Sequence, residues 1–436
     1  VDPYVLLPKS NRRADTETPT AYLERVAREG LRPVIIAGWT SLSTIWEDVD
    51  GKEQRGLNPE LDDLLDTMGA FSIVWDESHQ GKSHKRWKRL ARQDGGYCYE
   101  KRTTTAAVAG FLAPRAVRRL ALTATPMPDR TRDLWAQLDL VDPGLWGKYW
   151  DWAGKYCDAY EDMHGWDDKG SSNIEELRTE LARCAHIVPT ELMSTKLPPL
   201  RRTVTWLPKD ALSAASKEAR VGLKSAAKAA KGHKSGEAVE RLLQSKLELS
   251  ASRKTGHVVQ TVVDCLSGGQ KVLVFTGLRS NVERLRDAVQ IGLEKALPKA
   301  KGGNWKLWGA HGGTLPEDRE TIREDYMAYD GPACIVGTGA AWGESLNLQQ
   351  SDRLIIVMLP WTWGQIRQWE GRVRRLGGKP CLVEYLVAEG TIDERVSSIV
   401  LDKLAAVENV LPDEQVAEIR ITLQGGTDDA LIDGLL

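Results

Sequence analysis

The sequence predicts an α/β chain of two lobes, each built around a parallel β-sheet, with helical insertions between them. Short apolar runs bounded by turn residues recur in two groups, and such runs are typical of strands in a parallel sheet that is covered on both faces. Between strands the apolar period changes: Val282, Leu285, Val289 and Leu293 are three or four residues apart and form one stripe on a helix. Alternating strands and helices favour an α/β sheet in each lobe.

The predicted strands divide the chain into four parts. The first lobe is predicted over residues 1–128, with buried strands at 34–36, 73–75 and 120–122. The second lobe is predicted over residues 256–399, with strands at 272–275, 334–336, 354–357 and 382–383. Residues 129–255 show helical patterning and little strand character, which predicts a helical insertion, and residues 400–436 are predicted to be a helical tail.

Composition bounds the class of protein. A chain of 436 residues with 42% hydrophobic and 28% charged residues is typical of several globular domains. No apolar run approaches the roughly 20 residues that span a bilayer, so no membrane partner is expected. The six cysteines form no C-x-x-C pair, which argues against a zinc cluster and favours the reducing cytoplasm. A net charge of -2 means that nucleic-acid binding would need a local basic surface.

Two adjacent carboxylates follow the predicted strand at 73–75. Asp76 and Glu77 would lie at the carboxyl end of a parallel strand, where α/β folds bind ligands. One carboxylate can hold Mg²⁺ through its water shell, and the other can orient the water that attacks a γ-phosphate. On its own the pair is weak evidence, because many strands end in two acids.

A second motif lies about 45 residues downstream, again at a strand end. Thr123 and Thr125 in Leu122-Thr123-Ala124-Thr125-Pro126 carry small hydroxyls that can bond the acidic pair and sense the γ-phosphate. An ordinary strand-to-turn segment would explain this stretch if it stood alone. Its order and spacing after Asp76 and Glu77 favour a functional role.

The strongest motif is Gln368-Trp369-Glu370-Gly371-Arg372-Val373-Arg374-Arg375. A helix is predicted here, on which Arg372 and Arg375 share one face. Guanidinium groups held in this way can neutralise the charge that develops on a transferring phosphoryl group. A solvated helix face is the plain alternative, which the Q-x-x-G-R-x-x-R spacing makes less favourable.

Taken together, these motifs resemble those of superfamily 2 helicases of the Swi/Snf type. Motifs II to VI are matched, in order, by residues 76–79, 123–126, 271–276, 337–348 and 368–375. Residues 155–159, 165–166 and 172–177 are similar to the annealing-helicase subgroup, and the whole resemblance covers residues 31 to about 398. It implies two RecA-like lobes, ATP and Mg²⁺ as cofactors, and double-stranded DNA, bound without sequence preference, as the partner.

The resemblance also implies a role for individual residues. It assigns catalysis to Asp76, Glu77, Gln368, Arg372 and Arg375, with Asp76 and Glu77 at the metal. It adds His79, Gly343 and Glu344 to the nucleotide site and gives Thr123 and Thr125 a coupling role. DNA contacts are carried over to Thr40, Ser41, Thr276, His311 and Gly312, whose hydroxyl and backbone groups suit phosphate oxygens but are equally common as helix caps.

The chain departs from the family at the phosphate-binding loop. No G-x-x-x-x-G-K-[ST] pattern occurs in the sequence, and Gly81-Lys82-Ser83 lacks the first glycine and follows motif II. Because residues 34–43 match motif Ib, we expect the loop to be encoded upstream of Val1, and the chain to be inactive without it. Ser345 also replaces the usual glycine of motif V.

Two functions, and a weaker third, are consistent with these residues. The first is an ATP-dependent DNA translocase or helicase in a bacterial or phage-infected cytoplasm, near the nucleoid. The second is an ATPase-inactive module that binds DNA or protein. The third is the motor part of a larger DNA-processing system. A phosphate-binding loop upstream would discriminate between the first and the second.

Overall fold

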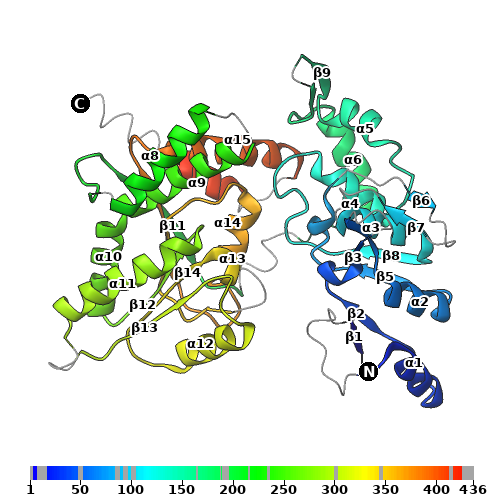
Figure 1. The fold of residues 1–436 in the computed structure, drawn as a ribbon, viewed down its shortest axis with the longest axis horizontal. Coiled ribbons are helices and arrows are strands. Elements are labelled where there is room, and N and C mark those ends of the chain that lie inside the picture. The colour runs from blue at the N-terminus through cyan, green and yellow to red at the C-terminus, as the bar shows by residue number, and fades with distance from the viewer. Residues whose placement is uncertain are drawn as a thin grey trace. The chain divides into compact units, whose positions relative to one another are not determined.

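The computed structural model describes residues 3–6, 17–47, 53–83, 89–91, 97–99, 105–163, 165–186, 188, 196–214, 217–232, 236–298, 303–342, 347–411 and 416–424. The chain forms two compact units, Val1–Leu177 (unit 1) and Arg178–Leu436 (unit 2). The predicted α/β class with parallel sheets is confirmed, as the strand pairings below show (Figure 1). None of the described helices is both long enough and apolar enough to cross a membrane. The four-part division of the chain stays a prediction.

Unit 1 contains small sheets of two strands each. Two are parallel: β1 (Tyr4–Leu6) with β2 (Ile35–Ala37), and β5 (Ser72–Trp75) with β8 (Arg118–Ala121). Three are antiparallel: β3 (Ser43–Glu47) with β4 (Glu53–Leu57), β6 (Arg89–Ala91) with β7 (Tyr97–Tyr99), and β9 (Tyr160–Asp162) with β10 (Gly165–Asp167). The helices are α1 (Pro19–Arg28), α2 (Pro59–Met68), α3 (Thr105–Leu112), α4 (Asp133–Val141), α5 (Tyr149–Tyr156) and α6 (Ile174–Cys184), the last of which runs across the boundary into unit 2. Short 3-10 turns lie at η2 (Trp39–Leu42), η3 (Ser78–Gly81) and η4 (Ala113–Arg115).

Unit 2 is built on one parallel sheet of six strands in the order β11-β16-β15-β12-β14-β13. The strands are β11 (Leu200–Leu207), β12 (Lys271–Thr276), β13 (Lys306–Ala310), β14 (Ala333–Thr338), β15 (Arg353–Ile356) and β16 (Cys381–Ala388). The helices are α8 (Lys217–Gly232), α9 (Gly236–Arg253), α10 (Thr255–Ser267), α11 (Arg279–Ala296), α12 (Pro316–Ala328), α13 (Gly339–Trp342), α14 (Trp363–Glu370) and α15 (Ile392–Val410). A further helical stretch covers residues 416–424.

Helices cover both faces of the unit 2 sheet. Val272 and Val274 of β12 belong to a core that also contains side chains of α10 and α11. Phe275, the next residue along β12, packs its ring edge-on against Trp369 of α14 at 5.9 Å between ring centroids. Successive strand residues thus pack on opposite sides, which explains why these runs are apolar without alternation.

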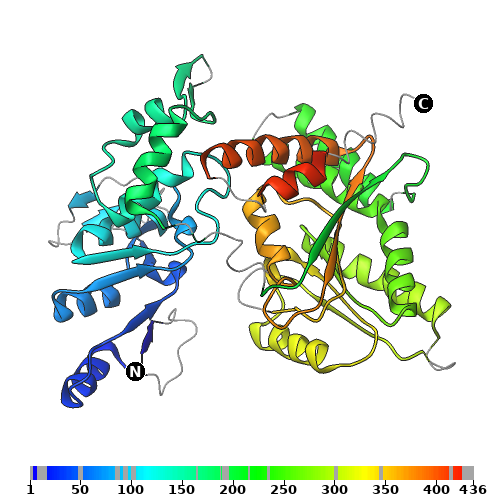
Figure 2. The ribbon, with the colours of Figure 1, turned by 180° about the vertical axis from the view of Figure 1, so that it is seen from behind.

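Two expectations about the strands are wrong. The region 129–255, read as helical, contains the eight-residue strand β11, which pairs in parallel with β16 at one edge of the sheet. Figure 2 shows this edge, with β11 in green beside β16 in orange. The β-branched run Thr203-Val204-Thr205 favours a strand there. In unit 1, β5 and β8 were expected to be buried on both faces, yet their described side chains alternate between more and less exposed positions.

Candidate functional site

The acidic pair of unit 1 lies where the sequence places it, directly after β5. Glu77 has a left-handed backbone with φ of 49°, and Asp76 accepts a hydrogen bond at Oδ1 from the Glu77 N–H at 3.0 Å. A non-glycine residue in this region costs on the order of 1–3 kcal/mol and is found mainly where the surrounding structure holds it for a function. Asp76 is exposed, so its carboxylate is accessible to a hydrated cation.

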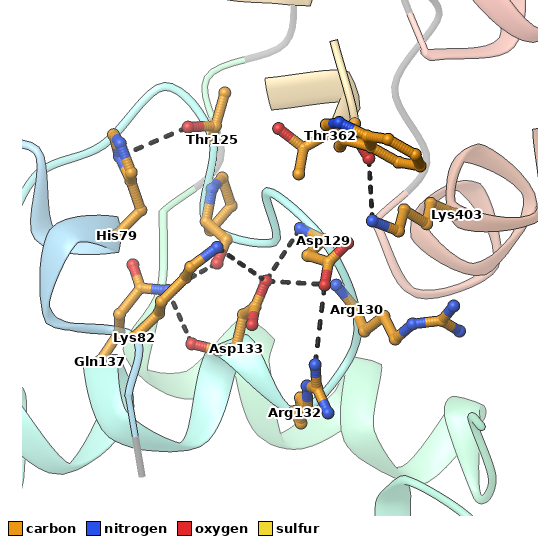
Figure 3. Close-up of polar contacts among 12 residues, drawn as sticks. His79, Lys82, Thr125, Asp129, Arg130, Arg132, Asp133, Gln137, Thr362 and Lys403 are labelled. Carbon is orange, nitrogen blue, oxygen red and sulfur yellow. Dashed lines mark hydrogen bonds and ion pairs between the residues drawn. The ribbon is translucent and has the colours of Figure 1, made fainter. Parts of the chain in front are cut away.

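His79 links this acidic pair to the threonines of the next motif. Its Nδ1 lies 3.1 Å from Glu77 Oε2, 3.0 Å from Thr123 Oγ1 and 3.4 Å from Thr125 Oγ1. Figure 3 shows His79 and Thr125 facing one another. The hydroxyls were expected to bond the acids directly, whereas these contacts run through the imidazole. Because β5 and β8 are parallel and Trp75 pairs with Ala121, both motifs leave the sheet at the same edge.

Two supporting residues were missed by the sequence analysis. The Trp39 indole donates from Nε1 to the Asp76 carbonyl at 2.8 Å and stacks on Trp75. Ser78 Oγ donates to Gln137 Oε1 at 2.9 Å, and Gln137 Nε2 donates to the Pro126 carbonyl at 2.6 Å. Gln137 thus joins the two motif loops from α4. A glutamine between the apolar residues Ala136 and Leu138 of a buried helix is the signal that could have identified it.

A second polar cluster lies below these loops, around the start of α4. Asp133 accepts at Oδ2 from the backbone N–H groups of Asp129 at 2.8 Å and Arg130 at 3.2 Å, and Lys82 Nζ is 3.9 Å from the same oxygen (Figure 3). Burial raises the pKa of Asp133, and the charge of Lys82 and these backbone bonds only partly offset the effect. Lys82, which the sequence analysis set aside as a phosphate ligand, therefore pairs with a carboxylate of its own unit.

The arginine motif of unit 2 differs from the prediction. Helix α14 begins after Thr362, whose Oγ1 accepts from the Gln365 N–H at 3.4 Å, and it ends at Glu370. Arg372 and Arg375 lie in the turns that follow, so they do not share a helix face. Gly371 caps the end of the helix. The chain then continues in tighter turns, in which the Arg372 N–H donates to the Trp369 carbonyl at 3.1 Å and the Val373 N–H donates to the Glu370 carbonyl at 3.1 Å.

These turns are held against the neighbouring loop. Arg372 is 7% exposed, and its carbonyl accepts from the Leu348 N–H at 3.0 Å. Arg375 is half-buried, and its Nε donates to the Gly371 carbonyl at 2.9 Å. Gln368 is half-buried on α14. Gly339 packs so closely that a Cβ there would lie 1.9 Å from the Trp369 indole, so only glycine fits.

The residues predicted to contact DNA fall into two kinds. Thr276 has no exposed surface, and its Oγ1 donates to Met358 Sδ at 3.2 Å; Ser41 is 6% exposed. Thr40 and Gly312 are exposed, and His311 is half-buried, with Nδ1 accepting from the Gly313 N–H at 3.0 Å. Thr276 and Ser41, whose side chains are buried, would need to contact DNA through their backbone groups. The remaining three residues have surface from which they can reach a phosphate. Gly343 and Glu344 lie outside the described residues.

Family models cover most of the chain. Residues 33–255 match the SNF2-related domain, and residues 255–377 match the helicase conserved C-terminal domain. The SWI/SNF-related matrix-associated actin-dependent regulator of chromatin subfamily A-like protein 1 of Xenopus laevis is 26% identical over 386 residues, which are 85% of this chain and 39% of that protein. The human DNA annealing helicase and endonuclease ZRANB3 is 26% identical over 342 residues, 76% of this chain and 29% of that protein.

A solved structure is also similar in part. The Sulfolobus solfataricus SWI2/SNF2 ATPase core in complex with dsDNA aligns with 95% of this chain and 76% of its own, at 18% identity and a TM-score of 0.35. The chain spans about two-fifths or less of the two curated relatives described above. The SNF2-related model alone matches residues 33–255, which are just over half of this chain. The chain therefore belongs to the SNF2-related family of helicase-type ATPase cores.

Proposed function

We propose that this chain is the motor of a DNA-dependent ATPase that translocates on duplex DNA. The observation that carries the proposal is the pair Asp76 and Glu77 at the end of β5, with Glu77 in a left-handed conformation and its carboxylate 3.1 Å from His79. An acidic pair held at such an edge is the arrangement that nucleotide hydrolysis requires. A cytoplasmic location near a bacterial nucleoid, or in a phage-infected host, is part of the same proposal.

The acidic pair fits a hard cation and a polarised water. Asp76 offers exposed carboxylate oxygen, the ligand type that Mg²⁺ prefers, and bound Mg²⁺ would supply charge neutralisation for the phosphates of ATP. Glu77 orients and polarises the attacking water. His79 holds the Glu77 carboxylate and contacts Thr123 and Thr125, so a shift of these threonines changes the position of the base. This contact is the coupling element of the proposal.

Unit 2 supplies positive charge. Arg372 and Arg375 carry guanidinium groups that can stabilise the charge that develops on the transferring phosphoryl group. The proposed nucleotide contacts are completed by Gln368, the first residue of this motif on α14, and by Gly343 and Glu344. The printed sequence contains no glycine-rich phosphate loop, so these residues form only part of a nucleotide site.

The DNA partner is proposed from the relatives and from local chemistry. The similar ZRANB3 is named a DNA annealing helicase. Thr40, His311 and Gly312 offer a hydroxyl, an imidazole and a backbone N–H to phosphate oxygens, and such contacts carry no sequence information. Thr276 and Ser41, whose side chains are buried, would contribute through their backbones. We therefore propose binding to duplex DNA without sequence preference.

A second candidate function is favoured by one observation. Because no G-x-x-x-x-G-K-[ST] pattern occurs in the 436 residues, the chain by itself can be a DNA- or protein-binding module that does not hydrolyse ATP. A motor that serves a larger DNA-processing system is a variant of the first proposal, and the chain's span of 29–39% of its relatives is compatible with it.

The test is ATP hydrolysis with and without duplex DNA. It uses the 436-residue chain and the same chain extended by whatever coding sequence precedes Val1. We expect DNA-stimulated turnover in the extended protein, and we expect Glu77→Gln to lower kcat by about 10²-fold or more, since the variant keeps the side-chain shape but loses the base.

The matched control is Glu24→Gln, the same change at an exposed carboxylate on α1. It should leave the rate of hydrolysis unchanged. If both proteins are silent with every duplex and single strand offered, while either binds DNA, the motor proposal is wrong and the binding module stands. Equal losses in Glu24→Gln and Glu77→Gln would also contradict the role of Glu77.

A further inference from the structure

Glu370, the last residue of α14, is buried in an ion pair that the motif does not explain. Its carboxylate receives two parallel bonds from Arg202 of β11, from Nε to Oε1 at 2.9 Å and from Nη2 to Oε2 at 2.8 Å. Both side chains are 4% exposed. A third bond comes from the Tyr385 hydroxyl of β16 to Oε1. Bidentate arginine–carboxylate pairs fix orientation as well as distance.

The sheet register explains why these two donors meet at one carboxylate. Arg202 pairs with Val383 and Val204 pairs with Tyr385, so Arg202 and Tyr385 are two residues apart on one face of the β11–β16 edge. That face is covered by α14. Tyr385 is fully buried, and burial followed by the nearby Glu370 charge raises its pKa well above the ordinary value, which keeps the hydroxyl a donor. Three donor groups thus converge on one glutamate.

The backbone of the same residue holds the arginine turns. The Glu370 carbonyl accepts from the N–H groups of Val373 at 3.1 Å and Arg374 at 3.0 Å. Glu370 is therefore anchored to two strands by its side chain and to the turns by its carbonyl. A movement of this residue would carry Arg372 and Arg375 with it. A hydrophobic residue would fill the position at a lower desolvation cost, so a buried charge here argues for geometric control.

We propose that Glu370 is a positioning residue: held by Arg202 and Tyr385, it fixes the turns that place Arg372 and Arg375 for the nucleotide phosphates. The role of these two arginines comes from the proposed function, and the inference rests on it in that respect. Arg202 and Tyr385 share this positioning role, because both bond the Glu370 carboxylate although they lie 168 and 15 residues from it in the sequence. The chemistry remains that of the arginines, which Glu370 orients without touching the nucleotide.

The first test is hydrogen exchange of the backbone amides in the 436-residue chain. We expect Glu370→Gln to speed exchange in residues 363–375 while segments of β12 and β14 keep their protection. Tyr385→Phe removes one donor and keeps the ring, so it should give a smaller change in the same segment. This readout needs no ATP hydrolysis.

The second test is steady-state hydrolysis by whichever form of the protein is active. Glu370→Gln should lower kcat by about 10- to 100-fold with little change in KM for ATP, because a displacement of about 1 Å at a catalytic group costs up to about 10²-fold in rate. Glu370→Asp keeps the charge and should restore part of kcat. The matched control is Glu418→Gln, which removes the 58% exposed carboxylate that also contacts Arg202. It should change neither exchange nor kcat.

Several outcomes would overturn the inference. Unchanged exchange in residues 363–375, or an unchanged kcat in Glu370→Gln, would show that the pair does not position the arginines. Faster exchange across the whole sheet, with a loss of kcat that equals the loss of folded protein, would reduce Glu370 to a stability role. A wild-type protein without any hydrolysis would contradict the proposed function instead, and the exchange data would still decide whether Glu370 holds the turns.

Discussion

The parallel strands of the two units have similar apolar sequences but different surroundings. In unit 2, β12 is buried along its whole length, and Val274 has no exposed surface. In unit 1, β5 is buried on one side only: Trp75 is 3% exposed, whereas Val74 is 58% exposed, and Leu120 of β8 is 51% exposed. Since burial contributes about 25 cal/mol per Å² of apolar surface, the same residue type stabilises one unit far more than the other.

Charged pairs differ between the units in the same way. In unit 2, Lys254 and Asp393 pair at 2.6 Å with side chains 0% and 5% exposed. In unit 1, Arg115 pairs with Asp62 and Asp66, each at 2.6 Å, and the side chain of Asp66 is 74% exposed. The comparison teaches that neither an apolar run nor an ion pair has a fixed energetic value. Its value depends on what covers it.

The largest expected effect comes from breaking the buried pair. Asp393→Asn would leave Lys254 charged and buried, and we expect the free energy of unfolding of unit 2 to fall by about 3–5 kcal/mol. Asp66→Asn, the same change in the exposed pair, should cost about 0–1 kcal/mol. Urea unfolding, with hydrogen exchange to assign the affected segments, measures both. Similar losses in the two variants would contradict the comparison.

A pH-dependent effect should follow from Glu384 of β16. Burial would raise its pKa, but hydrogen bonds from His257 and Thr205 and the charge of Arg353 lower it from 4.5 to about 2. The folded pKa is depressed, so this stabilisation is complete above about pH 4.5 and is lost as the pH falls towards 2. It amounts to on the order of 3 kcal/mol. Unfolding free energies measured between pH 6 and 2 should show the loss, and Glu384→Gln should flatten the curve in that window. If the free energy of unfolding of Glu384→Gln fell with pH as steeply as that of the wild type, Glu384 would be excluded as the source of the loss.

The smallest effects sharpen the comparison between the strands themselves. Val274→Thr places a hydroxyl in the core beside α10 and α11 and should lower the free energy of unfolding by about 1–3 kcal/mol. Val74→Thr makes the same change at an exposed position and should stay within about 0.5 kcal/mol of the original. Chemical denaturation of both variants tests the pair. A loss above 1 kcal/mol in Val74→Thr would mean that this face of β5 is covered in solution.

The sequence predicted the strands β2, β5, β8, β12, β14, β15 and β16, because apolar runs between turn residues mark strands wherever they pack. It did not predict their burial in unit 1, since Val74 and Val274 have the same side chain and only the neighbouring elements differ. It missed β11, whose Arg201-Arg202 pair reads as polar surface until the Glu370 partner is known. It expected Arg372 on a helix, although Gly371 ends that helix one residue earlier. The contact between Arg202 and Glu370 could not be predicted, because the two residues lie far apart in the sequence and no local pattern encodes their pairing. The functional roles of the site residues stay predictions.

Strand β16 has a mechanical consequence. Its adjacent residues Glu384 and Tyr385 anchor polar networks on opposite faces of the sheet, one to His257 of α10 and the other to Glu370 of α14. All eight residues of β11 are paired with β16, so β16 is held in register along its whole length. A displacement of α14 would therefore be felt at α10 through two adjacent residues of one strand.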